Sequence, residues 1–159
     1  NAGRVEQISP PRELYTHPRS QFVARFIGSN TILPGVVRGQ QDGNIMLETA
    51  FGVLGGANRA GIEAREGREM SIILPAEAVD LVPADVPEEE MRASFGSNTI
   101  PCTIERLQIV GHIMHMIVRF ADGQQINVEG HADKYRNRLK AGGNAFVAWR
   151  SANATVIDH

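Results

Sequence analysis

Two histidines, His112 and His115, are the first residues whose type and spacing suggest chemistry, because imidazole nitrogens are common metal ligands. They stand three positions apart in a β-rich segment. Side chains alternate between the two faces of a strand, so residues three apart point to opposite faces and would not converge on one ion. His17, His131 and His159 are isolated in the sequence. The spacing therefore favours structural histidines over a metal site.

Other patterns with catalytic or phosphate-binding potential are incomplete. The glycine-rich segment 52–56 lacks the lysine and the following helix of a phosphate-binding loop, and we interpret it as a flexible loop. Lys134 and Lys140 are the only lysines, neither follows a glycine, and no G-x-S-x-G elbow occurs. The single cysteine, Cys102, is interpreted as a small core residue in a reducing compartment. We expect no catalytic, cofactor-binding or metal-ligating residue in this chain.

Charge and composition narrow the classes of function. The 159 residues include 16 basic and 18 acidic side chains, which gives a formal net charge of −2 with neutral histidines. Nucleic-acid-binding domains normally show a basic excess, so nucleic acid is not an expected partner. Hydrophobic residues make up 42% and charged residues 21%, the balance of a soluble globular protein. No apolar stretch is long enough to cross a bilayer.

The elements that would position a site differ between the start of the chain and the rest. Residues 1–28 predict short helices, because prolines suit a first helical turn and Gly28 suits a helix end. In the second of these helices, four apolar residues fall on one face, and such a stripe needs a surface to cover. The four residues expected to pack in this way are Phe22, Val23, Phe26 and Ile27.

After Gly28 the hydrophobic pattern changes to the two-residue period of strands. Ile45, Leu47 and Thr49 alternate with Met46 and Glu48, and residues 112–120 form a long strand candidate with Met114, Met116, Val118 and Phe120 on one face. Asp122-Gly123 predicts a hairpin turn, with residues 125–129 as the returning strand. Many short strands separated by turn signals favour a small barrel or a sandwich.

An internal echo predicts two related lobes. The five residues 28–32, Gly-Ser-Asn-Thr-Ile, recur as residues 96–100, and each copy opens a run of strand candidates. Between the runs lies a proline-flanked acidic stretch that suits an exposed connection. The expected organisation is therefore linker helices over 1–28, a first lobe over 29–83, a connector over 84–93 and a second lobe over 94–159.

The opening residues carry a pattern that resembles a known family. Residues 3–8 (GRVEQI), 11–15 (PRELY) and 22–28 (FVARFIG) are similar to the end of the nucleotide-binding domain of bacterial ABC importer ATP-binding subunits. In that family this segment leads into an OB-like regulatory region, the TOBE domain. The resemblance implies a mainly β fold of two OB-like lobes preceded by short linker helices.

One position departs from the family pattern. Leu74 stands where the family's strand usually has an arginine, and Ala76 separates Pro75 from Glu77. This chain therefore lacks that arginine and any interaction that depends on it.

The resemblance also implies a function. The chain would be the regulatory and dimerisation region of the ATP-binding subunit, separated from an ATPase domain that holds ATP and Mg²⁺ and itself lacking ATPase motifs. Its partners would be a second copy, the permease subunits reached through the ATPase domain, and a small-molecule regulator, at the cytoplasmic face of the inner membrane. The linker is closest in style to polyamine and ferric-iron importers. The alternatives are a self-contained small-ligand or oxyanion sensor built from OB-like lobes and, less favoured, a hydrolase or metalloenzyme.

Overall fold

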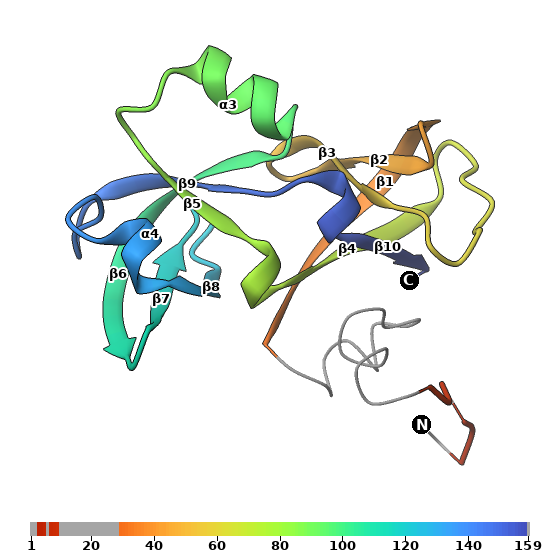
Figure 1. The fold of residues 1–159 in the computed structure, drawn as a ribbon. Helices are drawn as coiled ribbons and strands as arrows, with labels where there is room; N and C mark the ends of the chain where they lie inside the picture. The colour runs from red at the N-terminus through yellow and green to blue at the C-terminus, as the bar shows by residue number, and fades with distance from the viewer. Residues whose placement is uncertain (1–2, 6, 10–28, 159) are drawn as a thin grey trace. The chain divides into compact units, whose positions relative to one another are not determined.

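The computed structural model describes residues 3–5, 7–9 and 29–158, and strands dominate this part of the chain. The predicted linker helices of residues 1–28 fall almost entirely outside it. The elements in chain order are β1 (Asn30–Gln41), β2 (Asn44–Thr49), β3 (Gly52–Ala57), β4 (Glu69–Pro75), η1 (Ala76–Ala78), β5 (Asp80–Pro83), α3 (Glu88–Phe95), β6 (Thr99–Val110), β7 (Ile113–Arg119), β8 (Gln125–His131), α4 (Ala132–Tyr135), β9 (Asn144–Ala148), η2 (Ser151–Asn153) and β10 (Thr155–Asp158) (Figure 1).

The chain divides into two units. Unit 1 contains the described residues up to Pro75 and those from Ser151 onward, and unit 2 is Ala76–Arg150. In unit 1 the strands form a closed barrel in the order β1-β2-β3-β10-β4, with β10 parallel to β3 and antiparallel to β4. A five-stranded barrel with this order is the OB arrangement. The expected mainly β, OB-like fold is confirmed.

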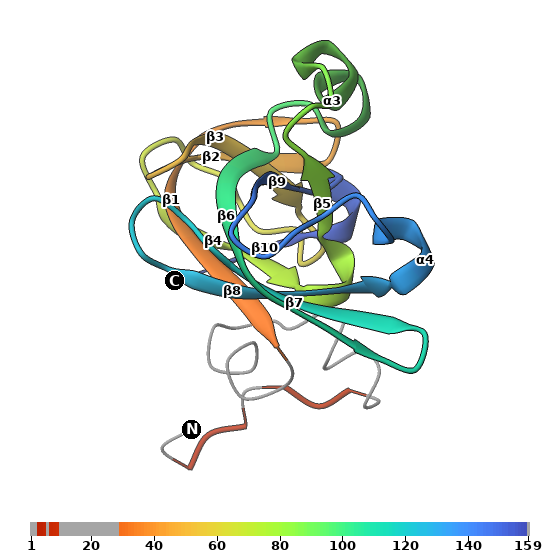
Figure 2. The same cartoon turned by 90° about the vertical axis from the view of Figure 1, so that its left-hand side faces the viewer.

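Unit 2 repeats this strand order in the sheet β5-β9-β6-β7-β8, where β6, β7 and β8 follow one another across the sheet (Figure 2). The registers agree as well. Leu33 of β1 lies opposite Ile72 of β4, and Ile100 of β6 lies opposite Val147 of β9; all four side chains are buried. Because a strand's side chains alternate, the same register places the same positions in the two cores. The two units are therefore structural repeats.

The repeats differ from the boundaries expected from the sequence. β5 lies within the expected first lobe but pairs with β9 of unit 2, whereas β10 lies within the expected second lobe but pairs with β3 and β4 of unit 1. β10 in unit 1 and β5 in unit 2 occupy equivalent places in the strand order, and we call each the fifth strand of its unit. Each unit thus takes its fifth strand from the other half of the sequence. Local patterning could not reveal this exchange, because both strands are four-residue segments with buried apolar side chains that suit either sheet.

Each repeat also has a β-bulge at the same point of its first strand. The pairing register of β1 shifts between Val37 and Gly39, and that of β6 shifts between Ile104 and Arg106. The backbone of Val37 exchanges hydrogen bonds with Gly67 and Arg68, as that of Ile104 does with Gly142 and Gly143. Gly67 and Gly142 have φ angles of 85° and 82°, a region that favours glycine. Val37 and Ile104 are therefore structurally equivalent. The number of residues between them is one fewer than the number that separates the two copies of the five-residue repeat, 28–32 and 96–100.

The expected connector over 84–93 contains the start of a helix rather than an entirely irregular segment. In α3, Met91 is 5% exposed and packs in a buried cluster with Val82 and Ala148, joined by Phe95 and Phe146. The three glutamates of its first turn are exposed, as expected for this acidic stretch. Acidic residues at a helix N-terminus interact favourably with its backbone dipole, which explains why this run can begin a helix.

The glycine-rich segment 52–56 is a strand, not the flexible loop that the sequence suggested. It lies within β3 and pairs with β2 along its length. A Cβ atom on Gly55 would lie 2.7 Å from Sδ of Met46 and 3.1 Å from Oγ of Ser151. Glycine is therefore present because neighbouring side chains approach the strand closely, and not because the segment is loose.

The hairpin predicted at the end of the long strand candidate is confirmed. β7 buries Met114, Met116 and Val118, and β8 returns after a turn at 122–123 in which Gly123 donates to the Phe120 carbonyl. Among the described residues, no helix has the length and apolar character needed to span a membrane.

Candidate functional site

The residues predicted to form the linker stripe are not within the described part of the chain. Phe22, Val23, Phe26 and Ile27 all precede residue 29, so their packing stays a prediction. His17 and His159 also lie outside the described residues.

The three remaining histidines gather at one end of the β7–β8 pair without forming a metal centre. His112 lies in the turn before β7, and its ring stacks on that of His131 with centroids 5.5 Å apart. Nδ1 of His115 lies 3.2 Å from a carboxylate oxygen of Glu129 on the adjacent strand. In the described ranges, no group of three or more His, Cys, Asp or Glu side chains is placed to hold a metal ion.

Cys102 and Leu74 both lie in the cores. Cys102 is 6% exposed in β6, and burial raises the pKa of its thiol to about 11 despite an opposing hydrogen bond with the Val147 backbone. The thiol is therefore protonated at neutral pH and a poor nucleophile. Leu74, where the family pattern has arginine, is fully buried in unit 1. An isolated guanidinium at this position would be costly to bury, so the leucine fits its surroundings.

A pocket on the outer face of unit 2 brings polar side chains from three strands together. Arg119 of β7, Thr103 of β6 and Asn144 of β9 lie directly opposite one another across the sheet. All three are exposed and line a pocket of about 250 Å³. Side chains alternate along β6, so Cys102 and Ile104 point inward and Thr103 points outward. The pairing register of β6 with β7 and β9 then places Arg119 and Asn144 beside Thr103 on the same face. We call these three residues the polar row.

The guanidinium of the polar row is held in place by its neighbours. Nε of Arg119 donates to a carboxylate oxygen of Glu105, and Nη1 donates to the Gly123 carbonyl at 3.0 Å. The amide of Gln125 donates to the other oxygen of Glu105. The hydrogen bonds from Arg119 and Gln125 lower the pKa of the Glu105 carboxyl, so this group is ionised at neutral pH. Arg119 is thus oriented before any ligand arrives.

Beside the polar row, the pocket has an apolar ledge. Pro101 lies two residues before Thr103 on the same face of β6, and Phe146 lies opposite Pro101 on β9. Phe120 and Ala121 line the same pocket. A mostly apolar surface with a few convergent hydrogen-bonding groups is typical of small-molecule sites. The arrangement can bind and orient a ligand, and it offers no activated nucleophile.

Sequence reasoning missed this site. The alternation in β6 indicates which side chains point outward, but it says nothing of which strands flank β6. Arg119 and Asn144 become neighbours of Thr103 only through the pairing of β6 with both β7 and β9.

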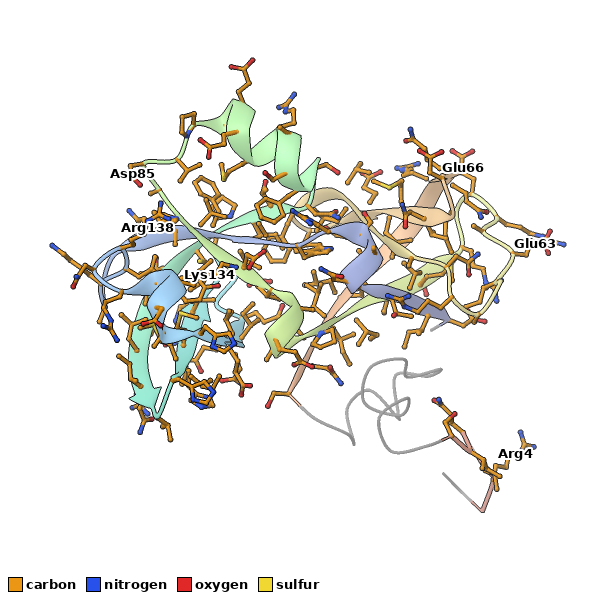
Figure 3. The ribbon with its side chains drawn as sticks, viewed as in Figure 1. Arg4, Glu63, Glu66, Asp85, Lys134 and Arg138 are labelled. Carbon is orange, nitrogen blue, oxygen red and sulfur yellow. The ribbon has the colours of Figure 1, made fainter. Side chains whose placement is uncertain are left out.

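A second polar cluster joins α4, which follows β8, to β5, the strand at the opposite edge of the unit 2 sheet. β5 and β8 contact each other without forming a strand pair. Lys134 of α4, which is labelled in Figure 3, forms an ion pair with Asp80 of β5, and the Leu81 amide donates to the Tyr135 hydroxyl at 3.3 Å. Burial opposes the charge of Lys134, but its bonds to Asp80 and Tyr135 still raise its pKa. This cluster links α4 to β5, and the hydroxyl of Tyr135 accepts the hydrogen bond of the Leu81 amide.

Comparison with known protein families shows to which family this chain belongs. The family model described as "TOBE domain" matches residues 77–157, about half of the chain. The chain belongs to the TOBE domain family. The resemblance stated from the opening residues is thereby confirmed through a different part of the sequence, since the family model matches the region from η1 to β10.

Individual relatives of this TOBE domain protein are ATP-binding proteins of transport systems. It is 28% identical over 158 residues to the spermidine/putrescine import ATP-binding protein PotA of Rubrobacter xylanophilus, covering 99% of this chain and 39% of that one. It is 25% identical to the putrescine transport ATP-binding protein PotG of Escherichia coli, covering 99% and 40%. The lactose transport ATP-binding protein LacK of Rhizobium radiobacter is 28% identical, covering 88% and 38%. The TOBE domain chain spans about two fifths of the length of these relatives.

A solved structure shares the fold. The cytoplasmic molybdate-binding protein ModG, crystallised with molybdate bound, superposes with a TM-score of 0.68 at 14% identity, covering 84% of this chain and 99% of that one. At this identity the likeness concerns the fold of the TOBE domain chain and not its ligand.

Proposed function

We propose that this TOBE domain chain is the C-terminal regulatory and dimerisation region of the ATP-binding subunit of an ABC importer that takes up polyamines. The observation that carries the proposal is the collinear match to PotA of Rubrobacter xylanophilus, which extends over 99% of this chain. The described residues hold two OB-like units and a binding pocket, which suit sensing and packing better than turnover.

In this proposal the chemistry of transport resides in a separate ATPase domain. That domain binds ATP and Mg²⁺, whereas the 159 residues of this chain include no phosphate-binding loop and supply neither cofactor site. The partners are a second copy of the subunit and, through the ATPase domain, the permease at the cytoplasmic face of the inner membrane. A small-molecule regulator acts on the OB-like units. Iron as the transported solute has no support among the relatives described above.

A chimera tests the proposal. The segment of PotA from Rubrobacter xylanophilus that matches residues 29–158 is replaced by those residues of this chain, and uptake of labelled spermidine is measured in cells that lack their own polyamine importer. We expect uptake well above that of a PotA variant in which the matching segment is deleted. A chimera that reaches the membrane and hydrolyses ATP, yet imports no better than the deletion variant, would contradict the proposal.

Dimerisation has its own measurement. Sedimentation of the isolated chain over a range of concentrations should show a monomer–dimer equilibrium, and a strict monomer at the highest concentration would remove dimerisation from the proposal.

The alternative is a self-contained small-ligand or oxyanion sensor, for which the likeness to ModG is one of fold alone. The coding sequence immediately upstream of Gly3 separates the two proposals: an ATPase domain there favours the importer, and a start codon favours the sensor.

A further inference from the structure

The two repeats present opposite chemistry at equivalent places on their outer faces. In unit 2 the polar row is Arg119, Thr103 and Asn144. The equivalent row of unit 1 is Glu48 of β2, Val36 of β1 and Glu69 of β4, which lie opposite one another in the same register. A row of hydrogen-bond donors in one repeat therefore replaces a row with two carboxylates in the other. The first row therefore presents donors that an anion can use, whereas the carboxylates of the second row cannot donate to an anion.

Donors in the polar row are available to a ligand. Nη2 of Arg119 makes no hydrogen bond to the described residues, because the partners of this side chain use Nε and Nη1. The hydroxyl of Thr103 and the amide of Asn144 likewise make no side-chain hydrogen bond within the described part of the chain. Guanidinium and amide N–H groups together suit a planar acceptor with two oxygens, which is the geometry of a carboxylate.

The carboxylate of Glu105 does not fill the position in front of the polar row where a ligand carboxylate would bind. Along the outward face of β6 the order is Pro101, Thr103 and then Glu105. Glu105 therefore holds Arg119 from one side of the row, and the pocket with its apolar ledge lies on the other side. None of the described residues that line the pocket is acidic, so a cation such as a polyamine finds no counter-charge among them.

We propose that this pocket of unit 2 binds a small organic carboxylate, with its carboxylate on Arg119, Thr103 and Asn144 and its apolar body on the ledge of Pro101 and Phe146. The pocket volume of about 250 Å³ is suited to a body the size of a single ring. Binding itself does not depend on the proposed importer function; only its use as a regulatory signal does. A binding measurement on the isolated chain can therefore fail while the importer proposal stands, and the reverse.

The test is a titration of the full ¹⁵N-labelled chain with benzoate, followed by NMR. We expect the amide signals of Thr103, Asn144 and Phe146 to shift with a dissociation constant of about 1 mM, in line with the affinity available to so few atoms. The signals of Val36 and Glu69 in unit 1 should not move. Neutral benzamide should bind at least about tenfold more weakly, because it lacks the charge that Arg119 recognises.

Two variants and one control locate the site. Asn144→Asp places a carboxylate in the polar row, and Arg119→Gln removes its charge; each should weaken benzoate binding about tenfold or more. Glu48→Gln, at the position of unit 1 that is equivalent to Arg119, should leave binding unchanged. Melting curves identify any variant that fails to fold, and Asn144 is exposed, so its replacement is well tolerated.

Three results would overturn the proposal. One is equal affinity for benzoate and benzamide, and another is unchanged benzoate binding by folded Asn144→Asp. The third is sulfate binding as tightly as benzoate with the same shifts, which would make the row an inorganic anion site without use of the ledge.

Discussion

The two repeats agree in register and differ in charge. Arg38 in the bulge of β1 forms an ion pair with Glu48 of β2, and Glu105 in the bulge of β6 forms one with Arg119 of β7. The positions are equivalent and the signs are reversed. Because an exposed ion pair works equally well in either orientation, the fold does not select its sign. The reversal leaves an arginine on the outer face of unit 2, and this residue becomes part of the pocket.

The repeats also differ in the contact between their fifth and third strands, which are β10 and β3 in unit 1 and β5 and β8 in unit 2. In unit 1, Thr155 of β10 lies opposite Ala57 of β3, and the Ala57 amide donates to the Ala154 carbonyl. In unit 2, side chains make the corresponding link, through Lys134 to Asp80 and Tyr135 to the Leu81 amide, as described above. A backbone link tolerates most substitutions, whereas a side-chain link depends on particular residues. Unit 2 is therefore the repeat whose closure is specified by side-chain chemistry.

A third difference lies at the tips of the first hairpins. The tip of unit 1 is polar and turns at Asp42-Gly43, whereas that of unit 2 carries Ile109 and Val110, each 56% exposed. Buried positions are constrained by packing against their neighbours, and exposed tips are not. The comparison teaches that the shared register is maintained by the cores, while the surfaces of the repeats have diverged.

The largest expected effect tests whether β10 is an integral strand of unit 1. Val156 is fully buried in β10, and Val156→Asp would bury an unpaired carboxylate in the barrel. We expect a loss of roughly 4 kcal/mol or more in unfolding free energy, with amide exchange accelerated throughout β1 and β4. The control is Val53→Asp at a position that is 43% exposed, where the change should stay within about 0.5 kcal/mol. Equal effects of the two substitutions would contradict the strand exchange.

The second prediction has a smaller expected effect and compares two glycines, one in each repeat, whose neighbours leave little room for a Cβ atom. A Cβ on Gly130 would lie 2.6 Å from the ring of Tyr135, which is held by its hydroxyl, whereas a Cβ on Gly55 would meet the flexible end of Met46. Gly130→Ala should cost about 2–3 kcal/mol and Gly55→Ala about 1 kcal/mol, because methionine can move aside. Gly39→Ala, with open space around it, is the control and should be close to neutral. Chemical denaturation measures all three, and the reverse order would show that the ring of Tyr135 is not held more firmly than the side chain of Met46.

The smallest effect concerns the inverted ion pair of unit 2. The pKa of Glu105 is lowered by its bonds to Arg119 and Gln125, so its contribution to stability is present at neutral pH. That contribution is lost as the pH falls below about 4.5 and through the lowered pKa of the folded state. A ¹³C NMR titration of the Glu105 carboxyl should give a pKa that rises toward its ordinary value in Arg119→Gln and stays unchanged in Arg38→Gln. An unshifted value in Arg119→Gln would show that the ion pair does not hold the carboxylate.

Much of the fold was predictable because it follows from local patterns. The alternation in residues 44–49 and 113–119, and the turn at 122–123, identified two hairpin strands and their buried faces. Segment 52–56 was misjudged because glycine has the same appearance in a loose loop and in a strand that is approached closely; only the positions of Met46 and Ser151 distinguish the two. The candidate site was not predictable at all, since its three polar residues come from strands that are distant in the sequence.

By itself, the sequence determined that this protein is mainly β, that it contains two related lobes, and that its opening segment resembles that of ABC importer ATP-binding subunits. Hydrophobic period and turn chemistry are local properties, and they are written directly in neighbouring residues. Only the tertiary structure decided that the lobes exchange their fifth strands and that Arg119, Thr103 and Asn144 form one row. Pairing between strands depends on long-range packing, which the order of residues along the chain does not specify.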